Sequence, residues 1–244
     1  MDDVRPLHSA SAEAGGGAEG EAQKLVESKE EFFQKIDYEI LEATLTEDEL
    51  YNRCLRARQH GVGTVLVRPC DVDSAGRFLG LGVVKVASTV GHPYGSSNSG
   101  VKVYECRDLL RRGVRVLHAY PNPGKMISRQ FQHQEVELIQ MADSCIEAGA
   151  LLKVVIDNPL LNEEMIIILC RMAKRVNAHF VTTTQPRDLE LVRKHCGFHV
   201  QMECGGVRTL AEAKLARELG CARISSPDPE SLMKEWSQCE VATS

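Results

Sequence analysis

Short apolar runs alternate along this chain with longer segments in which apolar residues recur at helical spacing. The runs that predict strands cover residues 37–41, 63–68, 83–90, 114–120, 151–157, 178–183, 198–203 and 222–225. The segments that predict helices cover residues 46–60, 71–79, 98–112, 129–148, 162–176, 185–196 and 210–219. Strands that alternate with helices of this length indicate βαβ units and a parallel sheet.

The strand runs are continuously apolar, as expected of strands that are covered on both faces. Eight parallel strands close a (β/α)8 TIM barrel, so we predict this α/β fold as a single domain over residues 23–238. The alternative is an open doubly wound sheet, which usually carries a glycine-rich loop after its first strand, and residues 41–46 contain no glycine. Residues 1–22, rich in Gly, Ala, Ser and Glu, predict a disordered tail, and residues 239–244 a frayed end.

The ends of the predicted helices carry capping residues. Glycines that can end a helix in the left-handed conformation follow at positions 61, 113, 149 and 220. Thr46 and Glu49 have the spacing of a capping box, and Asn162 and Thr209 are suitable N-caps. These residues support the same element boundaries as the hydrophobic pattern.

Composition narrows the class of protein. A net charge of −5, with 26% charged residues, gives no basic excess for nucleic acid or an acidic membrane. The longest apolar stretch, residues 165–170, is too short to span a bilayer, and no targeting segment is evident. Nine cysteines without a CxxC pair predict buried thiols in a reducing cytoplasm. Nothing in the sequence predicts a cofactor.

In this fold the functional residues lie at the carboxyl ends of the strands. The polar and ionisable residues at those ends are Arg68, Cys70, His92, His118, Tyr120, Asn122, Lys125, Asp157, Thr182, Thr183, Thr184, Glu203, Cys204, Ser225 and Ser226. After the seventh strand, Gly205 and Gly206 lead into a helix, which leaves backbone N–H groups to face an anion. We predict phosphate binding by Gly205, Gly206, Ser225, Ser226 and Thr183; the alternative is a tight turn with a helix cap.

Several blocks of the sequence resemble the deoxyribose-phosphate aldolase family, a family of class I aldolase barrels. The blocks are residues 37–41 (DYEIL), 88–95 (STVGHPYG), 101–105 (VKVYE), 151–157 (LLKVVID), 178–184 (AHFVTTT) and 205–209 (GGVRT). The resemblance runs from about residue 37 to residue 226. It implies a barrel, a phosphosugar substrate, and reversible carbon–carbon cleavage to an aldehyde phosphate and acetaldehyde.

The catalytic positions of that family do not carry over. The resemblance puts the Schiff-base lysine of strand six at Thr182 and a second lysine, on strand seven, at Met202. The family's strand-four aspartate matches His118. The glycine-rich segment after strand six is shortened to Gln185 and Pro186, and strand eight ends in Ser-Ser-Pro-Asp at 225–228. Since threonine and methionine cannot form an imine, the family's mechanism is expected to be replaced here.

Other residues could supply chemistry. Lys153 shares the parity of Asp157 on strand five, so both could point into the barrel. The family resemblance includes this lysine, so it is not a special replacement for the lost amine, and a buried Lys–Asp pair is its expected role. Lys125, past strand four, is expected to be solvated. His118 could act as a general acid–base near neutral pH, flanked by His92 and Asp157, or be a core histidine with satisfied hydrogen bonds. No metal site is predicted, although these two histidines with Asp157 and Glu203 could converge.

Three functions follow from this reading. The favoured one is a diverged lyase that acts on a small sugar or carbonyl compound, phosphorylated or not, through acid–base chemistry at His118. The second is a non-catalytic binding or regulatory homologue. The third is an active deoxyribose-phosphate aldolase that uses another lysine. The expected partner is a small molecule, with no nucleic acid and no membrane; a homo-oligomer stays open.

Overall fold

The protein is described by a computed structural model that covers residues 28–156 and 161–242. Eight parallel strands pair in sequence order and close into a barrel, with β8 returning to β1. The strands are β1 (Ile36–Ile40), β2 (Thr64–Val67), β3 (Lys85–Val90), β4 (Val116–Ala119), β5 (Leu151–Val155), β6 (Phe180–Thr183), β7 (Gln201–Cys204) and β8 (Arg223–Ser226). The predicted (β/α)8 barrel is confirmed, and the open-sheet alternative is wrong.

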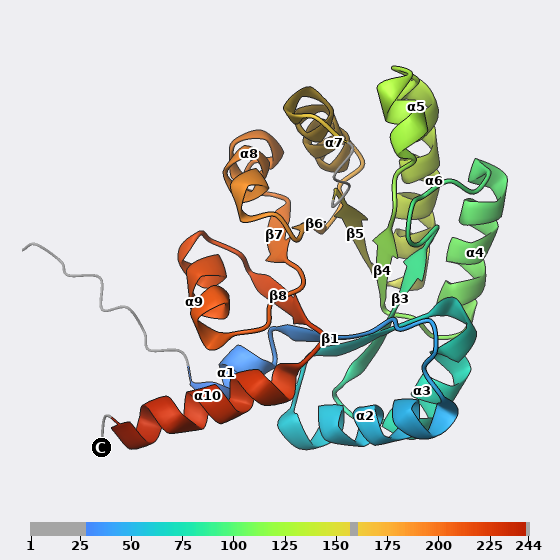
Figure 1. Cartoon of the computed structure of the whole chain (residues 1–244). Coiled ribbons are helices and arrows are strands. Elements are labelled where there is room, and N and C mark those ends of the chain that lie inside the picture. Colours follow the sequence, from blue (N-terminus) through green and yellow to red (C-terminus); the bar gives the residue numbers. More distant parts are fainter. Residues whose placement is uncertain (1–27, 157–160, 243–244) are drawn as a thin grey trace, which may run out of the picture.

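The helices surround the strands, as Figure 1 shows. They are α1 (Lys29–Phe33), α2 (Glu47–His60), η1 (Pro69–Asp71), α3 (Val72–Leu79), α4 (Ser99–Arg111), α5 (Pro123–Ile127), α6 (Phe131–Ala148), α7 (Glu163–Arg175), α8 (Pro186–Cys196), α9 (Leu210–Glu218) and α10 (Pro229–Ala242). The main core lies between this ring of helices and the outer face of the barrel.

The capping residues act as the sequence predicts. Thr46 and Glu49 form a reciprocal capping box at α2, and Thr209 caps α9 in the same way. Asn162 caps α7 through the N–H of Met165. The glycines at 61, 113, 149 and 220 all have positive φ, between 61° and 93°. One predicted helix is wrong in extent: residues 123–127 form a separate short α5, and the segment predicted from residue 129 becomes helical only at 131.

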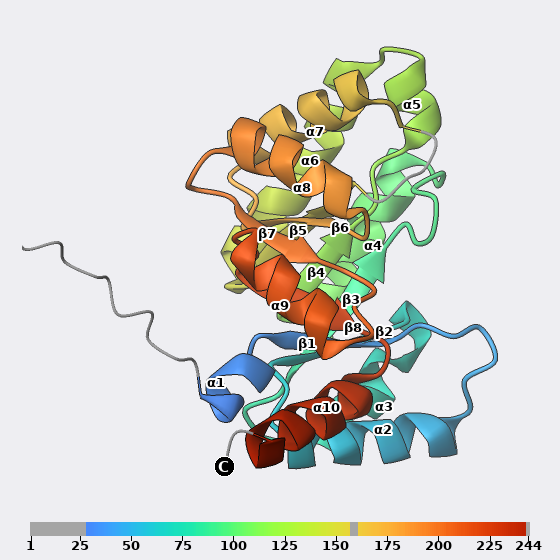
Figure 2. The ribbon, with the colours of Figure 1, turned by 60° about the vertical axis from the view of Figure 1, so that its left-hand side comes forward.

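The first and last helices lie side by side at one end of the barrel, as Figure 2 shows. Phe32 and Phe33 of α1 pack against Trp236 of α10, with ring centroids 4.8 and 6.4 Å apart. Lys29 Nζ donates to Ser237 Oγ at 3.0 Å. Helix α10 extends to Ala242, past residue 238, where the sequence put the end of the domain. The predicted tail, residues 1–22, lies outside the described residues.

Seven of the nine cysteines are buried, and none is in a disulfide. Only Cys70 and Cys239 are exposed. The prediction of buried thiols is therefore confirmed for most of them. Within the described residues, no helix is long and apolar enough to cross a membrane.

The register of the strands determines which side chains face the barrel interior. Leu66, Ala87 and Val116 are partners on adjacent strands and form a small apolar cluster, separate from the main core. The same alternation brings Asp37 of β1 and Lys153 of β5 into the interior. The interior of the barrel is thus apolar beside part of β2, β3 and β4, and charged along the side that runs from β5 through β8 to β1.

Candidate active site

A network of four charged residues occupies the barrel interior. Lys153 Nζ contacts both Asp37 Oδ2 and Glu203 Oε2, and all three side chains have no solvent exposure. Arg223 Nε of β8 donates to Asp37 Oδ1 at 3.0 Å. We call these residues the central charge network. Its two cations balance its two carboxylates, which is the condition under which charges can remain buried.

The network separates the two carboxyl groups in their proton affinity. Burial opposes ionisation of Asp37, but the Lys153 ammonium and the Arg223 guanidinium outweigh it and hold the pKa of Asp37 well below its usual range. Burial also raises the pKa of Glu203, to about 7, with Lys153 opposing the rise. Glu203 therefore titrates near neutral pH, whereas Asp37 stays ionised.

Thr182, at the position of the family's Schiff-base lysine, lies beside the network. It pairs with Glu203 in the register of β6 and β7, and its Oγ1 donates a long hydrogen bond of 3.5 Å to Glu203 Oε1. The Thr182 residue is 5% exposed. A chain of contacts therefore runs from the Lys153 ammonium through Glu203 to the Thr182 hydroxyl.

His118 has the interior position predicted for it but not the expected pKa. It is 2% exposed and is the register partner of Lys153. Burial, together with the Lys153 ammonium, lowers the pKa of His118 to about 3. Its Nε2 is buried without a hydrogen-bond partner in the described part of the chain. The sequence assigned it acid–base chemistry near neutral pH or satisfied hydrogen bonds; the imidazole is instead neutral and one nitrogen is unsatisfied.

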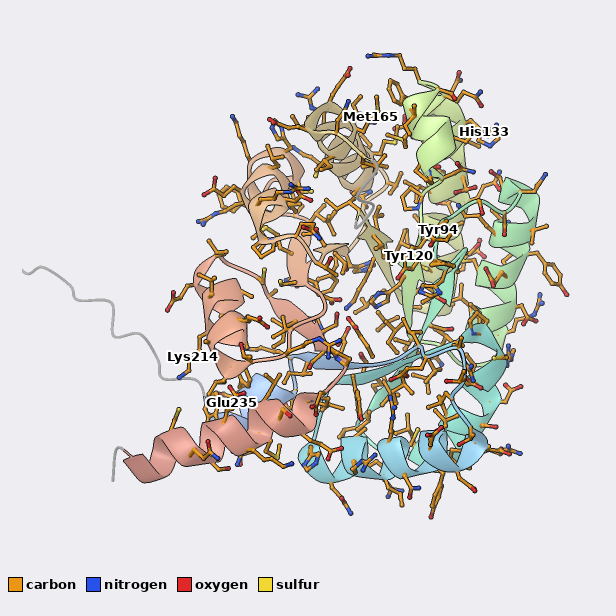
Figure 3. All side chains as sticks on the ribbon, viewed as in Figure 1. Tyr94, Tyr120, His133, Met165, Lys214 and Glu235 are labelled. Atoms are coloured by element: carbon orange, nitrogen blue, oxygen red, sulfur yellow. The ribbon has the colours of Figure 1, made fainter. Side chains whose placement is uncertain are left out.

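Of the residues expected to flank His118, one lies in the loop after β3 and the other outside the described chain. Asp157 falls in the segment that the structure does not describe. His92 lies in the loop after β3, with its ring edge-on to Tyr120 at 5.1 Å; Tyr120, at the end of β4, is labelled in Figure 3. Lys125 of α5 donates to Gln130 Oε1 at 2.8 Å on the surface. Lys153 was expected to pair with Asp157. Its interior partners among the described residues are Asp37 of β1 and Glu203 of β7.

The double-glycine loop (residues 204–209) has an internal partner at its predicted anion site. The N–H of Gly206 donates to Glu39 Oε1 at 3.3 Å, and Ser225 Oγ donates to the same oxygen. The N–H of Gly205 belongs to the strand ladder and donates to Thr183 O at 2.9 Å. Two predicted phosphate ligands therefore bind a carboxyl oxygen of β1.

Two other predicted phosphate ligands have local roles. Thr183 Oγ1 accepts from the N–H of Gln185 at 3.0 Å, and Ser226 Oγ accepts from the N–H of Asp228 at 3.1 Å. Both residues are completely buried. By strand alternation they face away from the interior positions of Thr182 and Ser225. Their hydroxyls stabilise the turns after β6 and β8, and phosphate binding by them stays a prediction.

On β7 the interior residue is Glu203, not Met202. Met202 lines a groove on the outside of the barrel with Gly220 and Ala222. The resemblance placed a family lysine at Met202, and in this chain that position faces the helices. The interior group contributed by β7 is thus an acid.

Three of the interior residues could in geometry hold a metal ion. Ligand atoms of Asp37, His118 and Glu203 all lie within 4.8 Å of one another. The Lys153 ammonium contacts both of these carboxylates and provides the positive charge that a metal ion would bring. A divalent cation would have to displace it, so the residues present fit the lysine better than a metal.

Sequence reasoning missed Asp37, Glu39 and Arg223 as interior residues. The signal was available in the alternation of strands one and eight, where residues two apart share a face. Asp37 lies beside Ser225 in the register of β1 and β8, so Glu39 follows on the same face. Their convergence with Lys153 from across the barrel depends on closure, which strand alternation alone does not reveal.

The chain resembles known aldolases in sequence and in fold. It is 28% identical over 200 residues to a deoxyribose-phosphate aldolase of Treponema denticola, covering 78% of this chain and 93% of the relative. It is 27% identical to that of Caldanaerobacter subterraneus, covering 88% and 97%. No family model matches the chain.

Solved structures agree on the fold. An aldolase named QR15 superposes with a TM-score of 0.81 at 24% identity, covering 87% of this chain and 99% of the other. A tetrameric deoxyribose phosphate aldolase from Aeropyrum pernix gives 0.77 at 21%, covering 87% and 93%. The closed ring of eight parallel strands is a (β/α)8 barrel, and its interior is charged. Taken with the curated relatives, the chain resembles the deoxyribose-phosphate aldolases over most of its length.

Proposed function

We propose that this chain binds a small sugar or carbonyl compound at the mouth of its barrel and acts on it by proton transfer, without an imine at position 182. The observation that carries the proposal is the chain of contacts from Lys153 through Glu203 to the Thr182 hydroxyl. The resemblance puts a nucleophilic amine at this position. A hydroxyl there can bind a carbonyl oxygen or relay a proton, but it cannot form an imine.

The proposed step keeps protons and electrons in balance. The C–H bond next to the substrate carbonyl breaks, and its proton goes to the Thr182 oxygen. The Thr182 hydroxyl proton moves to the Glu203 carboxylate, and the electron pair remains on the substrate as an enolate. An acid whose pKa lies near 7 suits this role at neutral pH. An enolate is also the product of a retro-aldol cleavage, so the proposal keeps the lyase class of the relatives.

Glu203 thereby takes the role that the sequence suggested for His118. A histidine with a pKa of about 3 is too weak a base to take up the proton at neutral pH. It is also not bonded to Thr182 in the described contacts, whereas Glu203 is. His118 is instead a neutral neighbour of the network.

Deuterium exchange tests the proposal. The protein is incubated with 2-deoxyribose in D2O, and loss of the proton signal at carbon 2 is followed by NMR. We expect faster exchange with the wild type than without protein. The catalysed exchange rate should fall by on the order of 100-fold or more in Glu203→Gln and in Thr182→Val. Glu218→Gln, which removes an exposed carboxylate at the far end of α9, is the matched control. Unchanged exchange in Glu203→Gln would contradict the proposal.

Two other functions have a supporting observation each. The mutual pairing of the central charge network favours a non-catalytic binding barrel, which would bind sugar without exchange. The burial of Lys153 inside the barrel favours an aldolase that uses this amine. Borohydride reduction in the presence of 2-deoxyribose 5-phosphate would then trap an adduct that peptide mapping assigns to Lys153.

A further inference from the structure

The strongest unexplained feature is a carboxyl group at the predicted anion site. Glu39 Oε1 accepts from the N–H of Gly206 at 3.3 Å and from the hydroxyl of Ser225. These donors belong to the double-glycine loop and to β8, and Glu39 belongs to β1. The ends of three different elements thus meet at one acceptor oxygen.

Glu39 lies at the border between the interior and the solvent. It is half-buried, whereas Asp37, two residues earlier on the same face of β1, is completely buried. Ser225 is the register partner of Asp37, so its hydroxyl reaches one layer toward the mouth to meet Glu39. The Gly206 residue is also half-buried. A ligand at the mouth would therefore meet Glu39 directly.

A carboxylate in this place opposes a phosphate in two ways. It uses donors that a phosphate would need, and it adds a like charge a few ångströms away. Arg68, which directly follows β2, is already paired and does not compensate. Its guanidinium donates to Asp71 Oδ2 and to the carbonyl oxygens of Glu42, Ala43 and Leu45.

Three further cations in the described part of the chain, Lys153, Arg223 and Arg208, also act on acids. Lys153 and Arg223 contact the carboxylates of the central charge network below it. Arg208, which is exposed within the double-glycine loop, contributes to lowering the pKa of Asp228, after the hydrogen bonds of Ser231. The local charge is therefore not arranged for a dianion.

We infer that Glu39 is a specificity-determining residue that closes the anion site between β7 and β8, so that the ligand of this barrel carries no phosphate and presents a hydroxyl or amino group to this carboxylate. The inference rests on the proposed function for the existence of a small ligand and adds its chemical class. It also assigns the altered specificity to one side chain, because the Gly206 and Ser225 donors are themselves present.

The test uses inorganic phosphate and two sugars as probes. Binding of phosphate, 2-deoxyribose and 2-deoxyribose 5-phosphate is measured by isothermal titration calorimetry for the wild type, Glu39→Gln, Glu39→Ser and the control Glu218→Gln. Glu39→Gln keeps the size of the side chain, and Glu39→Ser also opens space for the anion. Far-UV circular dichroism checks that each variant is folded.

We expect the wild type to bind 2-deoxyribose in preference to its 5-phosphate and to bind phosphate weakly. Removing the carboxylate should strengthen phosphate binding by on the order of tenfold to a hundredfold, most in Glu39→Ser, and leave Glu218→Gln unchanged. Equal phosphate affinity in the wild type and both Glu39 variants would overturn the inference. If the Glu39 variants gain phosphate binding but neither they nor the wild type bind sugar, the role of Glu39 is retained. The proposed function alone is then overturned.

Discussion

Replacing Lys153 by methionine is the sharpest test of the central charge network. Methionine keeps most of the side-chain volume but leaves Asp37 and Glu203 without their shared cation. Asp37 retains Arg223, at 3.0 Å, whereas among the described residues Glu203 retains the long hydrogen bond from Thr182. Breaking a completely buried pair costs about 3–5 kcal/mol of unfolding free energy. For a domain of this size that corresponds to a fall of roughly 6–20 °C in Tm.

The loss of unfolding free energy in Lys153→Met is measured by urea unfolding at about pH 8 and again at about pH 5. In the wild type, Glu203 is ionised at the higher pH and protonated at the lower. We expect the deficit of Lys153→Met to shrink at the lower pH, because a neutral Glu203 needs no cation. Arg129→Met is the control: it breaks an exposed pair with Glu164 at 3.0 Å and should cost less than about 1 kcal/mol. A deficit for Lys153→Met as small as that of the control would refute the reasoning.

Three further predictions concern single groups. In the wild type, the stability contributed by Glu203 is present below its unfolded pKa of 4.5 and is lost as the pH rises through about 7. The free energy of unfolding should therefore fall by on the order of 1–3 kcal/mol over that range. Urea unfolding at several pH values should show this fall in the wild type and not in Glu203→Gln. For His118, whose pKa falls to about 3, the imidazole nitrogens should keep the NMR shifts of a neutral ring from pH 8 to pH 5, with only small changes as Glu203 titrates nearby. Conversion to the imidazolium with a midpoint near 6.5 would contradict its burial. An aromatic disulfide reagent should modify two thiols quickly, those of Cys70 and Cys239, and all nine after denaturation; rapid reaction of more than two in the native protein would be inconsistent with the packing.

The sequence predicted the barrel because both its local and its periodic signals agree. The residues before and after Lys153, for example, are apolar at successive positions, so both faces of this strand are apolar. This pattern is expected of a parallel strand that is covered on both faces. The capping box at Thr46 and Glu49 and the N-cap at Asn162 have local causes, so they could be identified without tertiary information. The short α5 was missed because Pro123 starts a helix that lasts only one turn.

The site was predicted less completely, since it depends on contacts across the closed barrel. Lys153 and Asp37 are 116 residues apart, and Lys153 and Glu203 are 50 apart. Their pairing follows from closure and not from any local pattern. The same is true of Glu39, which meets Ser225 only because β8 returns to β1. The ordinary pKa expected for His118 was wrong because the burial of a side chain and the nearness of an ammonium cannot be read from its own strand.

We propose that the interior chemistry of this barrel does not pass through an imine. The most direct measurement is borohydride reduction of the wild type with 2-deoxyribose 5-phosphate and, separately, with 2-deoxyribose, followed by intact-protein mass spectrometry. The Treponema denticola deoxyribose-phosphate aldolase serves as the positive control for trapping. We expect an unchanged mass for this chain with both sugars. A stable adduct on Lys153 or on any other lysine would contradict it.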